Sequence, residues 1–430
     1  MNPYPTVKLL NCIATMIVTK IEIFDCEVSL VGFNPVMVRV HTDEGISGLG
    51  EVGLAYGAGA KAAVGILRDL ARFVLGKDPM NVEAIWEEMY RRTYWGMGGG
   101  PVIYGGISAY DIALWDIRGK VLKAPIYQLL GGKTNDKLRT YASQIQFGWG
   151  GTPLLAVHPS QYAEGARLAI AEGYDAIKVD PLQVGRDGSV TPDTGVKRQY
   201  FGLLRHDEIQ MGVERIAAIR EAVGPNVDII CEIHANLGTN AAIQFAMALE
   251  PYNIMFYEEP VNPLNANNFA RIAEKTTIPL ATGERSYTRW GYRELLEKQA
   301  LAVVQPDLCL VGGITEGKKI CDLANLYDAT VQVHVCGGPV STAASLHLEA
   351  VIPNFIIHEH HTYALKPCIR ELCVNDYQPQ QGQFTIPNAP GLGQELNEVK
   401  AMQYLVCTIE SNEKKERSET AQPTQGEYNY

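Results

Sequence analysis

The sequence predicts an α/β protein built from a closed barrel of parallel strands and a smaller α+β domain. The length of 430 residues suits a barrel plus one further, smaller domain. From Leu138 onward, a short apolar run, a loop and a helix-length amphipathic stretch follow one another repeatedly. This repetition is typical of βα units, which assemble into a parallel sheet. Together, the length and the repetition favour the barrel over a set of unrelated domains.

The smaller domain is expected at the N-terminal end, over residues 16–135. Alternating apolar residues and helix-forming stretches with an apolar stripe predict strands at 21–24 and 36–40 and helices at 62–74 and 109–121. The first strand pattern begins shortly after Met16, so we expect Met16 to be the native start. Gly131 and Gly132 are helix-breaking residues and place the end of this domain nearby.

Eight candidate strands follow in the barrel region, 136–365. They are short apolar runs bounded by turn residues, at 141–147, 176–179, 227–233, 254–257, 280–282, 302–304, 330–335 and 355–357. In a closed barrel the reactive side chains stand at the C-terminal ends of the strands. The polar segment 407–430 shows no apolar period, and we expect it to be a disordered tail.

Charge and cysteine content narrow the classes of partner. The formal net charge is -11, whereas nucleic acids and anionic membranes attract clustered Lys and Arg, so neither is an expected partner. No apolar run is long enough to span a bilayer. The nine cysteines are scattered, odd in number and without a CxxC pair, which favours reduced thiols in the cytoplasm.

Three glutamates stand at the ends of three successive predicted strands, with one βα unit between each. They are Glu232, Glu258 and Glu284. A single Glu at a strand end is usually a solvated residue, but three that converge cannot all stay ionised without a compensating cation. Oxygen ligands that leave positions open for water and substrate suit Mg²⁺, with Mn²⁺ as an alternative ion. The spacing therefore predicts a divalent metal site.

A second pair of residues predicts a general base. Asp307 follows the sixth candidate strand, and His334 lies within the seventh. Taken alone, a histidine in an apolar run is more often a hydrogen-bonded core residue than a catalyst. An Asp on the preceding strand would hold the imidazole in one tautomer and raise its basicity. The pair is therefore more informative than either residue.

Other strand ends and loops add candidates. Lys178 stands near the end of the second strand, where the alternative to a functional role is a surface ion pair with Asp180. The connection at 181–210 is unusually long and rich in glycine, and we expect it to cover part of the substrate pocket. The loop at Tyr56 is expected to reach over the same site from the first domain.

Seven short segments, in order and at barrel spacing, carry a family resemblance. They are Lys178-Val179-Asp180, Glu232-Ile233-His234, Tyr257-Glu258-Glu259-Pro260, Gly283-Glu284-Arg285, Gln305-Pro306-Asp307, the strand of His334, and Ile357-His358-Glu359. Together they resemble the mandelate racemase subgroup of the enolase superfamily. Within it the chain is most similar to acid-sugar dehydratases of the galactonate type and to bacterial dehydratases that have not been characterised.

The resemblance implies a (β/α)₇β modified TIM barrel with an α+β capping domain formed by both chain ends, including 366–406. It implies Mg²⁺ on the three glutamates and His334 with Asp307 as the base that takes the proton next to a carboxylate. His234 matches the histidine that protonates the departing β-hydroxyl. Glu359 matches a carboxyl group that binds the substrate carboxylate, and Lys178 matches a lysine near the same end.

The implied reaction is that of a hydro-lyase. A small-molecule sugar acid, an aldonate or an aldarate, would lose its α-proton, pass through an enediolate and become a 2-keto-3-deoxy acid. The resemblance also implies a homo-oligomer. The chain departs from the racemising members at Asp180, where they carry a second lysine, and this puts two-base racemisation in doubt.

Two other functions stay open at the level of sequence. An epimerase or cycloisomerase of a sugar acid would use the same scaffold, and the absence of a keto-acid product would distinguish it. A sugar-acid-binding protein without activity would use the same pocket. Ionisable groups at so many strand ends argue against the binding protein, because binding alone does not require them.

Overall fold

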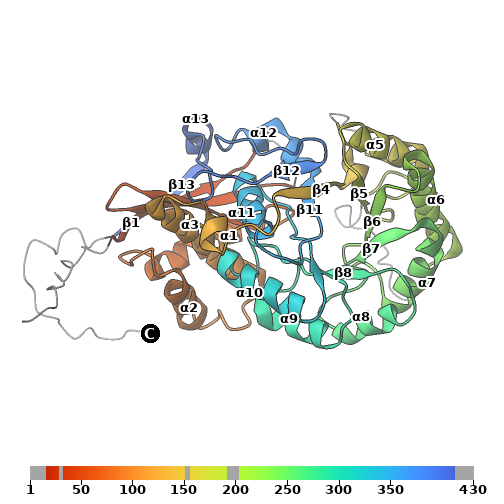
Figure 1. Cartoon of the computed structure of the whole chain (residues 1–430), viewed down its shortest axis with the longest axis horizontal. Coiled ribbons are helices and arrows are strands. Elements are labelled where there is room, and N and C mark those ends of the chain that lie inside the picture. Colours follow the sequence, from red (N-terminus) through yellow and green to blue (C-terminus); the bar gives the residue numbers. More distant parts are fainter. Residues whose placement is uncertain (1–15, 29–31, 151–154, 191–202, 412–430) are drawn as a thin grey trace, which may run out of the picture.

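The protein is described from a computed structural model that covers residues 16–28, 32–150, 155–190 and 203–411. Figure 1 shows two bodies side by side, a capping domain that contains α1, α2 and α3, and a ring of helices around a parallel sheet. No helix in these ranges is both long enough and apolar enough to cross a membrane.

The capping domain is an antiparallel sheet covered by helices, and both ends of the chain contribute to it. Its strand order is β13-β1-β2-β3. The strands are β1 Val18–Asp25, β2 Val36–Thr42, β3 Ser47–Val52 and β13 Leu405–Glu410. The helices are α1 Ala60–Leu70, α2 Val82–Arg92 and α3 Gly100–Leu122. Strand β3 and helix α2 were not predicted from the sequence.

The expected start of a disordered tail at 407 is wrong, because β13 continues to Glu410 and pairs with β1. In β13 half-buried Leu405, Cys407 and Ile409 alternate with exposed residues. This period was missed because the strand is short and merges into a polar segment. Residues 412–430 and 1–15, which include the sequence before the proposed start at Met16, lie outside the described residues.

One contact packs the cap together, and another fixes the cap on the barrel. Gly48 and Gly50 let α3 lie directly on β3, since a Cβ at Gly50 would overlap the carbonyl of Ala109. At the end of β3, the buried carboxylate of Glu51 accepts hydrogen bonds from the backbone N–H groups of Gly338 and Ser341. These groups belong to the first turn of a barrel helix, where unpaired N–H donors favour an anion.

The barrel has eight parallel strands in the order β10-β9-β8-β7-β6-β5-β4-β11. The strands are β4 Lys137–Ser143, β5 Ala176–Val179, β6 Asp228–Glu232, β7 Ile254–Glu258, β8 Leu280–Thr282, β9 Val303–Val304, β10 Thr330–Val331 and β11 His358–His361. A bridge between Val331 and Phe355 closes the ring, because the segment that continues into β11 then pairs with β4.

One helix follows each of the first seven strands. They are α5 Pro159–Ala171, α6 His206–Val223, α7 Thr239–Leu249, α8 Ala266–Ala273, α9 Thr288–Glu297, α10 Gly313–Leu326 and α11 Pro339–Glu349. Short helical turns occur elsewhere, including α4 Ile126–Leu129, α12 Pro367–Arg370 and α13 Glu398–Ala401. The predicted (β/α)₇β barrel with an α+β cap is confirmed.

Three strands differ from prediction by more than one residue. The first strand covers Lys137–Ser143, and 145–147 form a separate turn because Gln144 has a positive φ of 62°. The seventh ends at Val331, so His334 lies in the loop beyond the strand and not within it. The eighth runs over His358–His361, which places Glu359 inside the strand. Polar residues in that strand concealed it from an argument based on apolar runs.

The segment 366–406 contacts both bodies. Its short strand β12, Gln383–Thr385, pairs with β4 of the barrel. Further along, the backbone N–H of Leu392 donates to the carboxylate of Asp116 in α3, over 2.8 Å. The long connection after β5 ends earlier than expected, because α6 begins at His206, and residues 191–202 lie outside the described part of the chain.

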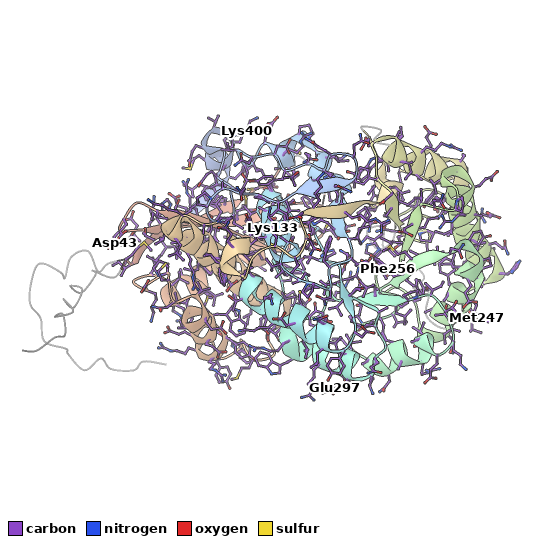
Figure 2. All side chains as sticks on the ribbon, viewed as in Figure 1. Asp43, Lys133, Met247, Phe256, Glu297 and Lys400 are labelled. Atoms are coloured by element: carbon purple, nitrogen blue, oxygen red, sulfur yellow. The ribbon has the colours of Figure 1, made fainter. Side chains whose placement is uncertain are left out.

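The barrel interior is apolar in the middle and polar at the C-terminal end. Phe256 of β7 points inward and is buried, whereas Met247 of α7 lies at the outer surface, 57% exposed (Figure 2). Because side chains alternate along a strand, the inward direction of Phe256 is shared by Glu258. The same alternation directs Glu232 of β6 inward, two residues after Ile230.

Candidate active site

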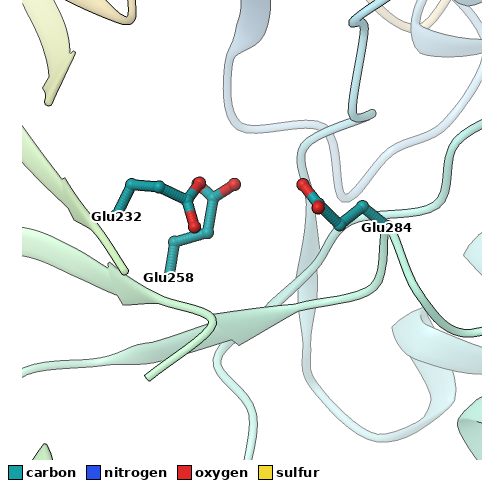
Figure 3. Close-up of side chains that lie close together, drawn as sticks. All are labelled: Glu232, Glu258 and Glu284. Atoms are coloured by element: carbon teal, nitrogen blue, oxygen red, sulfur yellow. The ribbon is translucent and has the colours of Figure 1, made fainter. Parts of the chain in front are cut away.

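Three carboxylates meet at the C-terminal end of the barrel. One oxygen from each of Glu232, Glu258 and Glu284 lies within 4.8 Å of the others (Figure 3). Glu232 and Glu258 end adjacent strands that pair in register. Glu284 follows Gly283, where a Cβ would lie 2.5 Å from the carbonyl oxygen of Gln305, so glycine is needed for the strand to reach this position. The structure brings the three predicted ligands together.

Burial makes negative charge on this cluster unfavourable. Glu232 and Glu258 are buried, with 0% and 1% exposure, and Oε2 of Glu258 has no hydrogen-bond partner in the described residues. Burial and the neighbouring Glu232 carboxylate raise the pKa of Glu258 well above its usual range. A divalent cation would remove this repulsion, and three carboxylate oxygens are the hard donors that Mg²⁺ prefers. The residues present therefore fit the metal that the resemblance implies.

Lys178 lies next to the carboxylates and is buried, with 1% exposure. Its Nζ is 2.7 Å from Glu258, 3.2 Å from Glu232 and 2.9 Å from Glu359. Burial acts to lower the pKa of the Lys178 amine, but the carboxylates outweigh it and raise that pKa well above the usual value. The alternative reading of Lys178 as a surface ion pair is wrong, because the side chain points into the barrel.

His334 is hydrogen-bonded as predicted from its pairing with Asp307. Its Nδ1 lies 2.8 Å from the Asp307 carboxylate, and its Nε2 lies 3.1 Å from Glu284. Burial opposes a charge on this imidazole, yet Glu284 and the hydrogen bond to Asp307 raise the pKa of His334 to about 9. Asp307 is itself buried and fixes the ring, so that Nε2 faces the carboxylate cluster.

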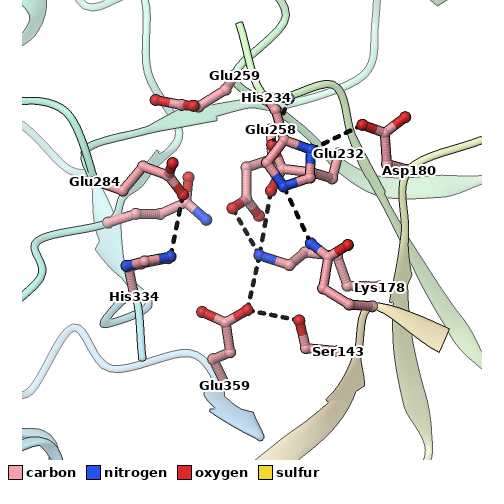
Figure 4. A network of polar contacts seen from close by, with 12 residues as sticks. Ser143, Lys178, Asp180, Glu232, His234, Glu258, Glu259, Glu284, His334 and Glu359 are labelled. Atoms are coloured by element: carbon pink, nitrogen blue, oxygen red, sulfur yellow. Dashed lines mark hydrogen bonds and ion pairs between the residues drawn. The ribbon is translucent and has the colours of Figure 1, made fainter. Parts of the chain in front are cut away.

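A second pair of the same kind, not predicted from the sequence, lies on the opposite side. Nδ1 of His234 is 2.8 Å from the carboxylate of Asp180. The backbone of His234 has a positive φ of 49°, and its N–H donates to the carboxylate of Glu232 over 2.9 Å. This hydrogen bond ties the loop to the carboxylate cluster. In Figure 4, His334 and Glu284 lie on one side of Lys178, and His234 and Asp180 lie on the other.

Glu359 is held rigidly beneath the cluster. One carboxylate oxygen accepts a hydrogen bond from the Ser143 hydroxyl over 2.6 Å, and the other accepts from the backbone N–H of Val335 over 2.9 Å. Burial acts to raise its pKa, but Lys178 and His334 overcome this effect and hold the pKa of Glu359 well below its usual range. The side chain is therefore an anion that points at Lys178.

These groups line a cavity of about 270 Å³. Lys178, His234, Glu284, His334 and Glu359 all contribute to its wall. The cap contributes residues that include Tyr56, as expected for its loop. The sequence argument missed further lining residues, among them Gln144 and Gln183, because amides near a strand end carry no distinctive spacing.

Comparison with known proteins agrees with this architecture. Residues 161–400 match the enolase C-terminal domain-like family, and residues 29–131 match the N-terminal domain of the mandelate racemase / muconate lactonizing enzyme family. The D-xylonate dehydratase of Haloferax volcanii is 36% identical over 382 residues, covering 87% of each chain. The D-galactonate dehydratase of Ralstonia nicotianae is 32% identical over 369 residues, covering 84% of this chain and 88% of the relative.

A crystal structure from Salmonella enterica subsp. enterica serovar Typhimurium, of a protein provisionally named a dehydratase, is 63% identical and superposes with a TM-score of 0.91 over 92% of this chain and 100% of that one. The family resemblance seen in the sequence is thus confirmed by the matched domains and by the relatives. The chain belongs to the mandelate racemase / muconate lactonizing enzyme family of the enolase superfamily.

Proposed function

We propose that this protein is a Mg²⁺-dependent sugar-acid dehydratase. The observation that carries the proposal is the placement of two His–Asp pairs on opposite sides of a carboxylate cluster (Figure 4). One histidine would remove a proton, and the other would donate one. The relatives named D-xylonate dehydratase and D-galactonate dehydratase support a sugar acid as the substrate. The proposed substrate is an aldonate or an aldarate.

Glu232, Glu258 and Glu284 would hold Mg²⁺, or Mn²⁺ in its place. The ion would act as a Lewis acid that lowers the cost of negative charge on the substrate carboxylate, an effect of several kcal/mol in order of magnitude. Lys178 would orient the same carboxylate from the other side, because its amine is fixed at 2.9 Å from Glu359 and 2.7 Å from Glu258.

His334 would act as the general base. A cation held by Glu284 would weaken the main interaction that raises the pKa of His334, and the imidazole could then lose its proton from Nε2. Asp307 accepts the hydrogen bond from Nδ1, so the lone pair of the neutral imidazole is on Nε2, which faces the cavity. Nε2 would take the α-proton of the substrate, leaving an enediolate. A base of this kind contributes roughly 10²- to 10⁴-fold to the rate.

His234 would act as the general acid. The protonated imidazole, stabilised by Asp180, would donate its Nε2 proton to the β-hydroxyl as the C–O bond breaks. The hydroxyl leaves as water, and the electron pair from the α-carbon forms the double bond of an enol. Tautomerisation of the enol gives the 2-keto-3-deoxy acid.

We propose further that the enzyme is cytoplasmic and a homo-oligomer. The eight described cysteines are all free thiols, which is consistent with a reducing compartment. A sugar acid as small-molecule substrate requires no partner macromolecule, and the negative net charge disfavours nucleic acid.

A library of acid sugars incubated with Mg²⁺, with keto acid detected as the semicarbazone, tests the proposal. We expect keto acid from the wild-type protein and none from Glu284→Gln, which removes one ligand oxygen charge. The two opposed histidines also suit an epimerase. That function would instead give an epimer labelled from D₂O at the α-carbon, with no keto acid. Absence of both products and of α-deuterium loss across the library would refute enzymatic activity on sugar acids.

A further inference from the structure

Large apolar side chains gather at the surface where the cap meets the barrel. Tyr94, Trp95 and Met97 lie in the loop between α2 and α3 and are 77%, 69% and 58% exposed. Leu264 lies between β7 and α8 and Trp290 lies on α9, with 86% and 47% exposure. We call these five residues the apolar face. In Figure 1, α2 and α9 lie along the same lower edge of the molecule.

A cleft of about 420 Å³ opens into the apolar face. Its wall includes Tyr90 of the cap, and Leu264 and Trp290 of the barrel. The rings of Tyr90 and Trp290 are stacked across the boundary between the two bodies, with their centroids 5.1 Å apart. Gly98, which follows Met97 in the loop, also lines the cleft. The loop of the cap and the residues of the barrel therefore border one cleft and form a single continuous surface.

The loop of the apolar face is held in a fixed arrangement. The backbone N–H groups of Gly98 and Gly99 donate to the hydroxyl of Tyr104 over 3.0 and 3.3 Å. Tyr94 has a positive φ of 67°, a strained conformation for a bulky residue. Its ring packs edge-on against the ring of Trp95, with the centroids 4.9 Å apart. The loop thus presents two large rings to the surface, preorganised as the anchors of an interface are.

The apolar face exposes more area than a surface without a partner normally does. An aromatic side chain can bury roughly 200 Å², so the exposed fractions of Tyr94, Trp95 and Trp290 leave roughly 400 Å² of ring surface in water. Met97 and Leu264 add to this area. Monomeric proteins rarely expose a contiguous apolar patch above a few hundred Å². Counted on two copies, the rings alone supply about 800 Å² of the roughly 1,200–2,000 Å² that a stable interface buries.

The charges beside the apolar face favour a second copy of this chain as the partner. Arg91 follows Tyr90 on α2, and Glu294 lines the cleft on α9, with side chains 61% and 62% exposed. A two-fold axis through the cleft brings Arg91 of one copy toward Glu294 of the partner subunit. Their present contacts with Glu87 and Lys298 are exposed ion pairs of small energy, so they can be exchanged. Since each chain has a net charge of -11, a face with both signs of charge also limits the repulsion between two copies.

We propose that the apolar face is the contact surface between two copies of this chain about a two-fold axis, with Tyr94 and Trp95 of each copy packed against the cleft of the other. This inference rests on the homo-oligomer proposed above and specifies its surface and symmetry. In such a contact one surface supplies the apolar area and both charges. Arg285 and Tyr287 line both this cleft and the catalytic cavity, so the partner subunit covers the outer side of a wall of the proposed active site.

Sedimentation velocity over a dilution series of the full chain measures the dissociation constant of the assembly. Trp95→Glu places a charge in the contact and should raise this constant by roughly 10²-fold. Tyr94→Gly should raise it as well, and glycine adopts the positive φ of this position without strain, so the fold is preserved. Met247→Glu is the matched control, because Met247 is 57% exposed on α7, outside the apolar face (Figure 2). Circular dichroism verifies that each variant is folded.

The outcomes separate this inference from the proposals on which it rests. A wild-type protein that is monomeric throughout the series overturns both the homo-oligomer and the inference, and leaves the cleft to a small molecule or another protein. If the wild type assembles and both variants of the apolar face dissociate as it does, or Met247→Glu dissociates as readily as they do, the inference alone is overturned. Weaker assembly of Trp95→Glu and Tyr94→Gly with an unchanged Met247→Glu supports it. Keto-acid formation is measured independently, so none of these results decides the dehydratase proposal.

Discussion

The substitution Lys178→Met tests the electrostatic balance of the carboxylate cluster. The lysine is 1% exposed and its amine lies within 3.2 Å of three carboxylates. Methionine therefore keeps most of the packing and removes a cation that contacts all three. Loss of one partner from a buried ion pair costs about 3–5 kcal/mol. The raised pKa of Glu258 lets that group stay protonated. In the absence of metal, we therefore expect the free energy of unfolding of Lys178→Met to fall by an amount near the lower end of this range.

The same substitution should strengthen metal binding. With the lysine charge gone, a divalent cation becomes the main compensation for the glutamates. The free energy of unfolding of Lys178→Met should therefore rise more with added Mg²⁺ than that of the wild type. A ligand present at 100 times its dissociation constant raises the free energy of unfolding by about 2.7 kcal/mol.

The assay is urea unfolding of both proteins in EDTA and in saturating Mg²⁺. Lys318→Met is the control, since Lys318 forms an ion pair with Asp322 on the surface of α10 and should change stability by only about 0.5 kcal/mol. The reasoning would be refuted if, in EDTA, the free energy of unfolding of Lys178→Met were lower than that of the wild type by less than about 1 kcal/mol. It would also be refuted if Mg²⁺ raised the free energy of unfolding of the variant and of the wild type equally.

Three further predictions concern the histidine pairs and the contact between cap and barrel. Asp307→Asn should lower kcat by roughly 10²- to 10⁴-fold with a nearly constant KM, because it removes the charge that orients His334. Exchange of the substrate α-deuterium with water measures this loss, and a nearly normal exchange rate would contradict the prediction. His234→Asn should slow dehydration more than α-deuterium exchange, and equal slowing of the two would remove its leaving-group role. Burial raises the pKa of Glu51 from 4.5 to about 7. The folded state then binds this proton more tightly than the unfolded state, so the contribution of Glu51 to stability falls as pH rises from about 4.5 to about 7, by about 3 kcal/mol. Urea unfolding across this pH range should show a steeper decline for wild type than for Glu51→Gln, and parallel curves would exclude this effect.

The sequence by itself determined the direction of the central carboxylates. Glu232 and Glu258 end strands whose apolar residues alternate in the interior, and a period of two fixes the side to which each points once the strand is placed. The order of βα units then brought Glu284 beside them. This information is local, and it survives small errors in the strand ends.

Tertiary structure decided the partners of these groups. Asp180 and His234 are 54 positions apart in the sequence, and they meet because a positive φ at His234 turns its side chain toward the neighbouring strand end. Gln144, with φ of 62°, joins the cavity wall in the same way. A backbone conformation of this kind is stabilised by contacts from other strands, so no local pattern of residues predicts it.

The tertiary structure also decided what the charges experience. A surface ion pair was the alternative to a functional role for Lys178 at the level of sequence, yet the side chain is enclosed by three carboxylates that come from three different strands. Burial depends on closure of the whole barrel, because each strand covers only one side of a neighbour. The sequence therefore determined which reactive groups stand at the strand ends, and the closed barrel with its cap determined how they pair and how strongly their charges interact.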